Sequence, residues 1–417
     1  MIKDILKSTW SLFLGIALLM LGNGLQGTLV SWRANYEGFE PSTIGWIMTA
    51  YYLGFLIGSL YTTRLIQQVG HTRVFAVLAS LASTAVLVQI LIISPDVWLM
   101  MRLISGFCFA GVYVVVESWL NAKSDNQTRG QVLSFYMFVS FSGLAAGQLL
   151  LNMFDPAKFS LFLLSSILLS LALIPVLTSR SDAPVIENTE TMSIKKLFNI
   201  ASAGVVSIAL NSLVQGIMFG MGAVYAANAG MSVSQTAVFM SVFIAVGALF
   251  HWPLGWLSDK IDRRIVILGA NIIAVILSAI LFKLDNQTRL FIFTFGMLGA
   301  FVLPIYSLNV AHINDRLKPE QMTHASSTII LIFGLGSVLG PLTVGYALNT
   351  FGNSSFFVYI GIINLLSTLL LIYFIFQHEA VLTEDQVDYQ LAPSKPTIIA
   401  MEAIAEEAEE TMLTDDE

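Results

Sequence analysis

Charge and cysteine are both scarce in this chain. Of its 417 residues, 11% are Asp, Glu, Lys or Arg, whereas 56% are hydrophobic. A soluble domain carries about 25% charged residues, so this composition excludes a molecule whose whole surface faces water. The one cysteine, Cys108, lies inside an apolar run, which excludes an internal disulfide framework and a cysteine metal site.

The short motifs of several enzyme classes are also missing. The chain contains no nucleotide-binding P-loop, no HExxH zinc motif and no GxSxG nucleophile elbow. We therefore expect neither a pump driven by its own ATP hydrolysis nor a membrane enzyme. We also expect no metal, no cofactor and no nucleic-acid partner.

Long apolar runs are what the chain has in abundance. About 20 apolar residues in a helix cross the roughly 30 Å of hydrocarbon in a bilayer. The first run is too long for a cleaved signal peptide and lacks a clear small-residue cleavage site. We predict an all-α polytopic membrane protein with twelve transmembrane helices, at residues 9–32, 42–63, 74–93, 97–121, 131–152, 158–178, 199–227, 234–257, 265–284, 289–312, 323–349 and 355–376.

The basic residues are unevenly divided between the two sides of this arrangement. Fifteen of the 20 Lys and Arg residues fall on the side of the termini. Since cytoplasmic loops carry the excess of Lys and Arg, we predict that both termini are cytoplasmic and that the protein lies in a bacterial inner (plasma) membrane. The formal net charge of −7 comes from the tail, which holds 12 acids and one lysine from Gln377 onward. This composition favours solvated disorder, with a transient helix in its Ala-Glu repeats as the alternative.

Glycine motifs recur at a constant offset. Gly143-x3-Gly147 in the fifth run matches Gly336-x3-Gly340 in the eleventh, 193 residues later. An offset of six spans makes the repeat parallel, which is typical of transporters built from two six-helix halves. We expect these glycines and Pro341 to serve helix packing and bending. The predicted organisation is an N-terminal half over residues 1–178, a cytoplasmic linker over 179–198 with a short surface helix from Thr191, a C-terminal half over 199–376, and an acidic tail over 377–417.

A charged loop follows the eighth apolar run. Its residues Gly255-x3-Asp259-Lys260-x2-Arg263-Arg264 resemble the loop signature of the major facilitator superfamily. The resemblance implies a transporter in which these five residues latch the cytoplasmic gate while the transporter faces outward.

The first-half counterpart of this loop has Thr63 and Gln67 in place of the Gly and the Asp. We therefore expect gating to depend on the second-half loop. Arg102-x3-Gly106 resembles the fourth-helix signature of proton-coupled members of the superfamily. The chain looks most like the YcaD-like branch, whose members are mostly assigned as transporters without a settled substrate, through Arg102 to Glu117, Arg129-Gly130, Gly147-Gln148, Trp252-Pro253 and Gly340-Pro341.

Glu117 is the single carboxylate well inside any predicted span. Such a group is costly unless it is paired, protonated or facing water. We expect Arg64 and Arg129 as its partners, in a structural ion pair of the gate or in a proton-carrying site. His251 is a further candidate for proton relay, with a hydrogen-bonded interfacial histidine as the alternative.

Polar side chains near the middle of the spans predict a central cavity. Equivalent positions in two symmetric halves converge there in transporters of this architecture. The alternatives are interhelical hydrogen bonding for the amides and, for Arg102, snorkelling to the membrane surface. The candidates for substrate contact are Asn23, Gln26, Tyr51, Arg102, Tyr113, Gln148, Asn211 and Gln215.

Together these features predict a secondary active transporter that moves a small molecule by alternating access. We expect coupling to protons rather than sodium, because no cluster of intramembrane acids is available to bind a cation. An amide-lined, mostly apolar cavity with one Arg fits amphiphilic or weakly anionic molecules better than sugars. The alternatives are an uncoupled facilitator and a non-transporting receptor or enzyme, against which the half-repeat argues. We expect a monomer in the lipid bilayer.

Overall fold

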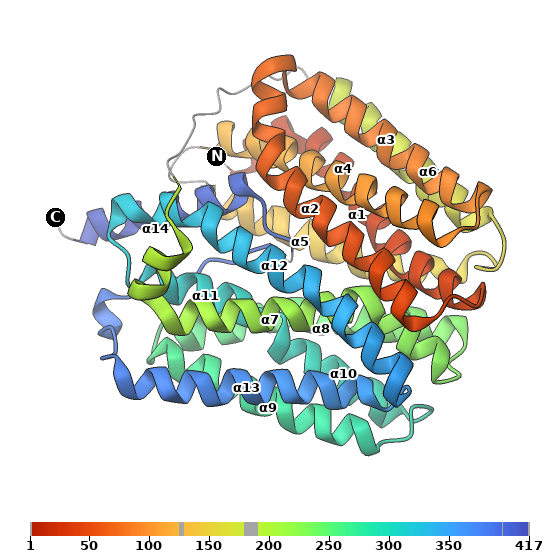
Figure 1. Ribbon diagram of the computed structural model, residues 1–417. Helices are drawn as coiled ribbons and strands as arrows, with labels where there is room; N and C mark the ends of the chain where they lie inside the picture. Colours follow the sequence, from red (N-terminus) through yellow and green to blue (C-terminus); the bar gives the residue numbers. More distant parts are fainter. Residues whose placement is uncertain (1, 125–128, 179–190, 394, 416–417) are drawn as a thin grey trace.

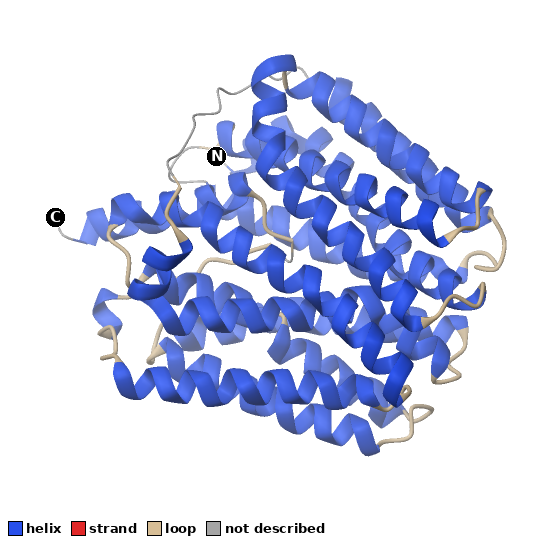
Figure 2. Ribbon diagram, viewed as in Figure 1, coloured by secondary structure: helices blue, strands red, loops and turns tan. Residues whose placement is uncertain are grey.

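The computed structural model describes residues 2–124, 129–178, 191–393 and 395–415, and all regular elements in this part of the chain are helices (Figures 1 and 2). Twelve of the helical segments are long and apolar enough to cross a membrane, as predicted. The first half comprises α1 (Ile2–Tyr36), α2 (Pro41–Val69), α3 (His71–Leu91), α4 (Pro95–Ala122), α5 (Arg129–Leu149), the short 3-10 helix η1 (Leu150–Asn152) and α6 (Ser160–Thr178). The second half comprises α7 (Ile194–Asn228), α8 (Val233–Ser258), α9 (Arg263–Lys283), α10 (Arg289–Val302), α11 (Pro304–Asn314), α12 (Pro319–Phe351) and α13 (Ser355–Gln377).

The predicted tenth span consists of two helices, α10 and α11. Pro304 begins α11, and a proline has no N–H with which to bond the carbonyl four residues earlier. The helix therefore breaks at this point, after Leu303 donates its N–H to the Gly299 carbonyl at 3.1 Å.

The seventh span begins earlier than expected. Ser193 caps α7 by accepting the Lys196 N–H at 3.3 Å. Ala201, at φ −136° and ψ 53°, kinks the helix, so a short helical segment precedes the spanning part. This segment lies where a short helix was expected from Thr191. Residues 179–190 of the predicted linker lie outside the described residues.

Glycines permit close contact between helices within each half. A Cβ on Gly147 of α5 would lie 2.5 Å from the Leu21 carbonyl oxygen of α1. In the second half a Cβ on Gly340 of α12 would lie 2.4 Å from the Leu213 carbonyl oxygen of α7. Gly143 and Gly336 meet Met20 and Ser212 in the same way, and Pro341 packs on Gly220.

The two ends of the bundle differ in how the halves meet. The loops between α2 and α3 and between α8 and α9 lie at the end that also holds both chain termini, called here the tail end (Figure 1). At the opposite end, called the far end, α2 and α12 touch directly: Thr49 donates to the Val338 carbonyl at 3.0 Å, and Trp46 donates to the Tyr346 hydroxyl at 3.2 Å. A Cβ on Gly45 would lie 2.6 Å from the Pro341 carbonyl oxygen.

At the tail end the C-terminal segment lies between the halves. It contains the 3-10 helix η2 (Thr383–Asp385) and helix α14 (Ile398–Asp415), which packs on α12, α4 and α5 (Figure 1). This order corrects the expectation of a solvated, disordered tail. The physical reason is that α14 is enclosed between the halves: the apolar face formed by Met401, Ile404 and Ala408 is buried, and Ile399 and Ala403 are buried on the opposite side. Average composition gives no sign of these buried positions.

Candidate functional site

Arg102 occupies the interior of the first half. Its side chain is 2% exposed, and the guanidinium lies over the Tyr51 ring, 4.2 Å from the ring centroid. This is cation–π geometry. Arg102 therefore does not snorkel to the membrane surface, the alternative raised by the sequence. Its Nε and Nη1 atoms are buried and have no hydrogen-bond partner among the described residues.

A polar network from α1, α2 and α4 surrounds this arginine. The Tyr51 hydroxyl donates to Asn23 Oδ1 at 3.3 Å, and the Asn23 amide donates to the Tyr113 hydroxyl. Thr28 donates to Gln148 of α5. One cavity is lined by Asn23, Gly24, Gly27, Thr28, Met48, Tyr51, Tyr52, Arg102, Leu144, Gln148, Phe219, Met240 and Lys395. Of the expected cavity residues, the structure therefore brings together Asn23, Tyr51, Arg102 and Gln148, with Tyr113 one hydrogen bond away.

The amides of the seventh span do not line this cavity. Asn211 of α7 donates to the Val302 carbonyl of α10 at 2.9 Å, and Gln215 donates to Asn211 Oδ1 at 2.9 Å. Gln26 lies within 3.5 Å of the Ser105 hydroxyl. The contacts of Asn211 and Gln26 match the interhelical alternative, whereas the Gln215 bond lies within α7. The symmetric cavity expected from the repeat is therefore polar on the side of the first half only. The second half contributes Phe219 and Met240.

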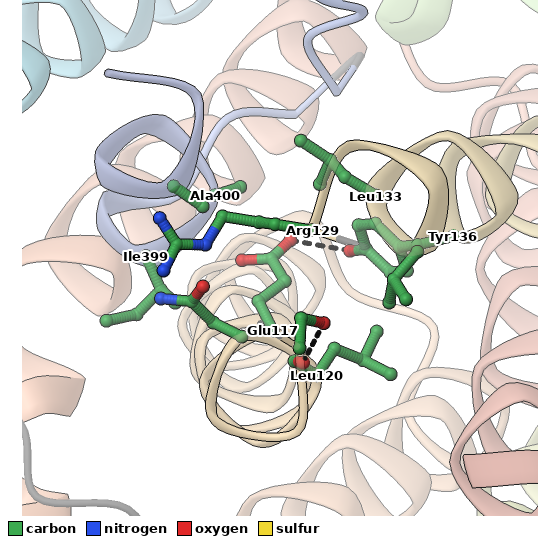
Figure 3. Close-up of a pocket in the computed structure, with 11 residues that line it drawn as sticks. Glu117, Leu120, Arg129, Leu133, Tyr136, Ile399 and Ala400 are labelled. Atoms are coloured by element: carbon green, nitrogen blue, oxygen red, sulfur yellow. Dashed lines mark hydrogen bonds between the residues drawn. The ribbon is translucent and has the colours of Figure 1, made fainter. Parts of the chain in front are cut away.

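Glu117 lies nearer the tail end of α4 and is 4% exposed. The Tyr136 hydroxyl donates to its Oε1 at 2.5 Å, and the Thr397 hydroxyl donates to its Oε2. Figure 3 shows the Tyr136 bond and places Arg129 beside the carboxyl group. Tyr136 and Thr397 were not among the expected partners. Each belongs to a different segment from Glu117, and no local sequence pattern indicates that a hydroxyl group from another segment will face a buried acid.

The two cations expected beside Glu117 behave differently. Arg129 lines the pocket that contains Glu117, and its Nη1 is 3.0 Å from Glu406 Oε2 of α14. Arg64 is exposed, with its guanidinium 5.5 Å from the Tyr61 ring centroid. Arg64 therefore does not form the expected gate pair with Glu117. Its guanidinium instead contacts Tyr61 on the exposed side of its own helix, α2.

His251 is buried against a backbone acceptor. Its Nδ1 is 2.8 Å from the Gly247 carbonyl oxygen, and its ring packs on Phe141 of α5 at a centroid distance of 5.3 Å. This geometry is that of a hydrogen-bonded interfacial histidine, the alternative to a proton relay.

The signature loop forms a buried ion cluster. Arg263 is 0% exposed and contacts both Asp315 oxygens, at 2.7 and 2.9 Å, and Asp259 at 2.8 Å. Burial raises the pKa of Asp315 to about 6, although Arg263 opposes the shift. Arg264 pairs with Asp262 at 2.8 Å, and Lys260 lies over the Trp256 ring.

This cluster faces the tail. Tyr389 donates its backbone N–H to Asp259 at 3.0 Å, and a Cβ added to Gly255 would lie 2.3 Å from the Tyr389 ring. Asp315 was not among the residues expected in this cluster. It lies between Asn314 and Arg316 in a loop with two basic residues. A lone acid among bases was the sequence feature that could have indicated its ion pair.

Comparisons with known proteins agree with this architecture. The sequence model of the Major Facilitator Superfamily matches residues 12–252 and 200–396. The chain is 26% identical over 360 residues to the uncharacterized MFS-type transporter YcaD of Escherichia fergusonii, covering 86% of this chain and 93% of the relative. It is 27% identical over 362 residues to YcaD of Escherichia coli strain K12, with the same coverage.

Solved structures share the fold. The nucleoside transporter NupG superposes with a TM-score of 0.75 at 13% identity, covering 89% of this chain and 99% of NupG. A bacterial homolog of the human lysosomal transporter Spinster, in an inward-facing and occupied conformation, superposes with a TM-score of 0.70 at 14% identity, covering 90% and 97%. Twelve helical segments of the described residues are long and apolar enough to span a membrane, and the family match makes this chain a multi-pass membrane transporter. It belongs to the Major Facilitator Superfamily and is YcaD-like.

Proposed function

We propose that this protein is a proton-coupled secondary transporter of a bacterial inner membrane, and that it moves a small organic anion with an apolar body by alternating access. The observation that carries the proposal is Arg102: a buried guanidinium with two nitrogen atoms lacking acceptors, at the wall of a cavity between the halves. The tail end, rich in Lys and Arg, is then the cytoplasmic end.

The substrate class follows from what Arg102 lacks. Burying an unpaired charge is costly, and an anionic group supplies the missing acceptors through charge-assisted hydrogen bonds. The other cavity walls include Tyr52, Phe219 and Met240, which suit an apolar or aromatic body. The polar side chains of the cavity gather around Arg102 on the side of the first half, which suits a molecule with one polar end better than a sugar with hydroxyl groups on every side.

Glu117 is the residue for proton coupling in this proposal. It lies 15 residues after Arg102 on α4, about 22 Å along the helix at 1.5 Å per residue. Between them Tyr113 and Tyr136 line one chamber, so hydroxyl groups extend from Glu117 toward Asn23 and Tyr51. Sodium coupling is disfavoured because the described residues hold no group of three or more His, Cys, Asp or Glu side chains that fits a metal ion.

Alternating access is supported by the asymmetry of the two ends. The halves meet directly at the far end through α2 and α12. At the tail end they are separated by α14. This arrangement corresponds to a state open toward the cytoplasm except for the tail.

The substrate class is tested by thermal-shift measurements on the purified full chain against aliphatic and aromatic monocarboxylates, with matched amines and sugars. We expect carboxylates to stabilise the wild type and to have at least tenfold weaker effect on Arg102→Gln. Stabilisation by amines or sugars alone would contradict an anion site.

The coupling is tested in proteoliposomes by following internal pH while the stabilising acid is added outside. We expect a substrate-dependent proton flux in the wild type that Glu117→Gln abolishes while leaving exchange of substrate across the membrane. An imposed pH gradient without effect on wild-type accumulation would instead identify an uncoupled facilitator.

A further inference from the structure

The C-terminal segment from Glu379 to Asp415, called here the tail, is attached to the bundle at three successive places. The first is the signature loop. Arg263 donates to the Val387 carbonyl at 2.8 Å, and Val387 donates its N–H to Asp315 at 3.0 Å. Since Tyr389 bonds Asp259 in addition, the ion cluster of the loop serves as an anchor for the tail backbone.

The second attachment lies deep between the halves. Lys395 Nζ is 2.9 Å from the Tyr51 hydroxyl and 4.6 Å from the centroid of its ring. Lys395 thus lines the cavity that contains Arg102. Two residues later, Thr397 donates its hydroxyl to Glu117. The tail therefore lines the cavity beside Arg102 and bonds Glu117, the two groups to which the proposed transport cycle assigns substrate and proton.

The third attachment is α14, which contacts both halves. Its apolar face packs into a cluster with Met322, Ala325 and Ile329 of α12, and Ser326 donates to the Met401 carbonyl at 3.1 Å. On the side of the first half, Arg129 of α5 pairs with Glu406. A wedge bonded to both halves prevents them from approaching each other at this end.

We propose that the tail is a tethered plug: docked, it fills the tail-end opening of the transport pathway and competes with substrate for the cavity beside Arg102, and it must withdraw before the halves close at that end. The family's loop signature is reused in this state. Arg263 and Asp259 hold the tail instead of the opposite half. Release of the tail frees them for the latch contact that the family resemblance implies.

Docking is opposed at one point, which makes it reversible. Lys395 and Arg102 share one aromatic ring, and the described residues that line their cavity include no Asp or Glu. Burial, with a smaller contribution from Arg102, lowers the pKa of Lys395 to about 7. The apolar face of α14 and the backbone anchors offset this repulsion. An anion bound at Arg102 therefore directly changes the balance between the docked and the withdrawn tail.

The test uses thiol accessibility in the full chain. Cys108→Ala provides a cysteine-free background, and Ser140→Cys places a reporter in the chamber that Pro393 and Lys395 line. The release variant is Met401→Lys with Ile404→Lys, two buried positions on α14. The control is Glu409→Lys, on the partly exposed side of the same helix. A membrane-impermeant maleimide is the probe, and Ala400→Cys reports docking itself.

We expect Ser140→Cys to react at least tenfold faster in the release variant than in the unmodified tail, and at an unchanged rate in the Glu409→Lys control. Asn152→Cys, exposed at the far end, should react equally in all of them and so verify the fold. Acceleration at Ala400→Cys without acceleration at Ser140→Cys would overturn the plug. Rapid reaction of Ala400→Cys in the unmodified chain, or its continued protection in the release variant, would overturn docking through the apolar face of α14.

Discussion

Two cations converge on one tyrosine ring in this protein. Arg102 and Tyr51 stood out in the sequence because polar groups inside apolar runs are conspicuous. Lys395 did not, since it is one lysine in an acidic tail whose composition suggests solvation. Its hydrogen bond to Tyr51 spans 344 residues of sequence, and no local pattern encodes a contact that depends on the whole tail folding back.

The symmetry of the repeat also gave a wrong prediction for individual amide side chains. It predicted that Asn211 and Gln215 would mirror Asn23 and Gln26 around a cavity. Equivalent positions share a backbone environment, but the partner of each amide depends on its neighbours, and Asn211 finds the carbonyl of Val302 that precedes the break before Pro304.

The lowered pKa of Lys395 predicts that docking of the tail depends on pH. The ordinary pKa of lysine is 10.5, and in the docked tail it is about 7, so the docked state binds fewer protons. The contribution of Lys395 to docking therefore grows as pH rises from about 7 toward 10.5 and is constant below about 6. The titratable groups around Lys395 are Tyr51, Tyr52, Arg102, Tyr113 and Tyr136.

The measurement is the maleimide reaction rate of Ala400→Cys at pH 7 and pH 9, expressed relative to the same chain with Lys395→Gln, which carries the same thiol chemistry. Protection should increase by roughly tenfold or more with Lys395 present. A ratio that stays constant across this range would show that Lys395 remains charged when docked.

At the level of elements, the spanning helices were predictable because membrane insertion depends on local hydropathy over about 20 residues. The helix α14 was not predicted as ordered. Its buried residues Met401, Ile404, Ala405 and Ala408 follow helical spacing, but the helix has only about five turns and acids are interspersed among its apolar residues. An isolated helix of this length is marginal, and packing on α12 supplies what its own sequence does not.

Close packing at Gly147 predicts a specific cost of enlarging it. A Cβ there would lie 2.5 Å from a carbonyl oxygen and 3.0 Å from the Gly24 Cα, both of them backbone atoms that shift only with the helix. We expect Gly147→Ala to lower the free energy of unfolding by about 1–3 kcal/mol. Thermal denaturation in detergent measures it.

Gly269 of α9 is the matched control, because an added Cβ there meets nothing within 4 Å. Gly269→Ala should leave the stability unchanged or raise it by up to about 1 kcal/mol, the difference in helix propensity. Equal losses in the two variants would mean that helix approach at Gly147 contributes nothing particular.

At the scale of the whole molecule, the proposed transport cycle requires the halves to separate at the far end. A Cβ on Gly345 would lie 3.4 Å from the Ser42 Cα, which brings these positions close enough for a disulfide between α2 and α12. The same Cβ would lie 2.8 Å from the Pro41 carbonyl oxygen, so the reduced form of the double variant is the reference for transport. In the Cys108→Ala background, Ser42→Cys with Gly345→Cys should lose transport of the stabilising acid under oxidation and regain at least half of it on reduction. Full transport by the oxidised, cross-linked protein would exclude opening at this end.

The tether of the tail has a quantitative effect on any binding experiment. Lys395 follows the end of α13 by 18 residues, so the plug competes at an effective concentration of the order of millimolar, independent of how dilute the protein is. The apparent dissociation constant of a substrate on the intact chain is then its intrinsic constant divided by the fraction of molecules with the tail withdrawn. Weak apparent affinity in a purified sample is therefore a property of two linked equilibria, and affinities for different molecules become comparable only when the position of the tail is known.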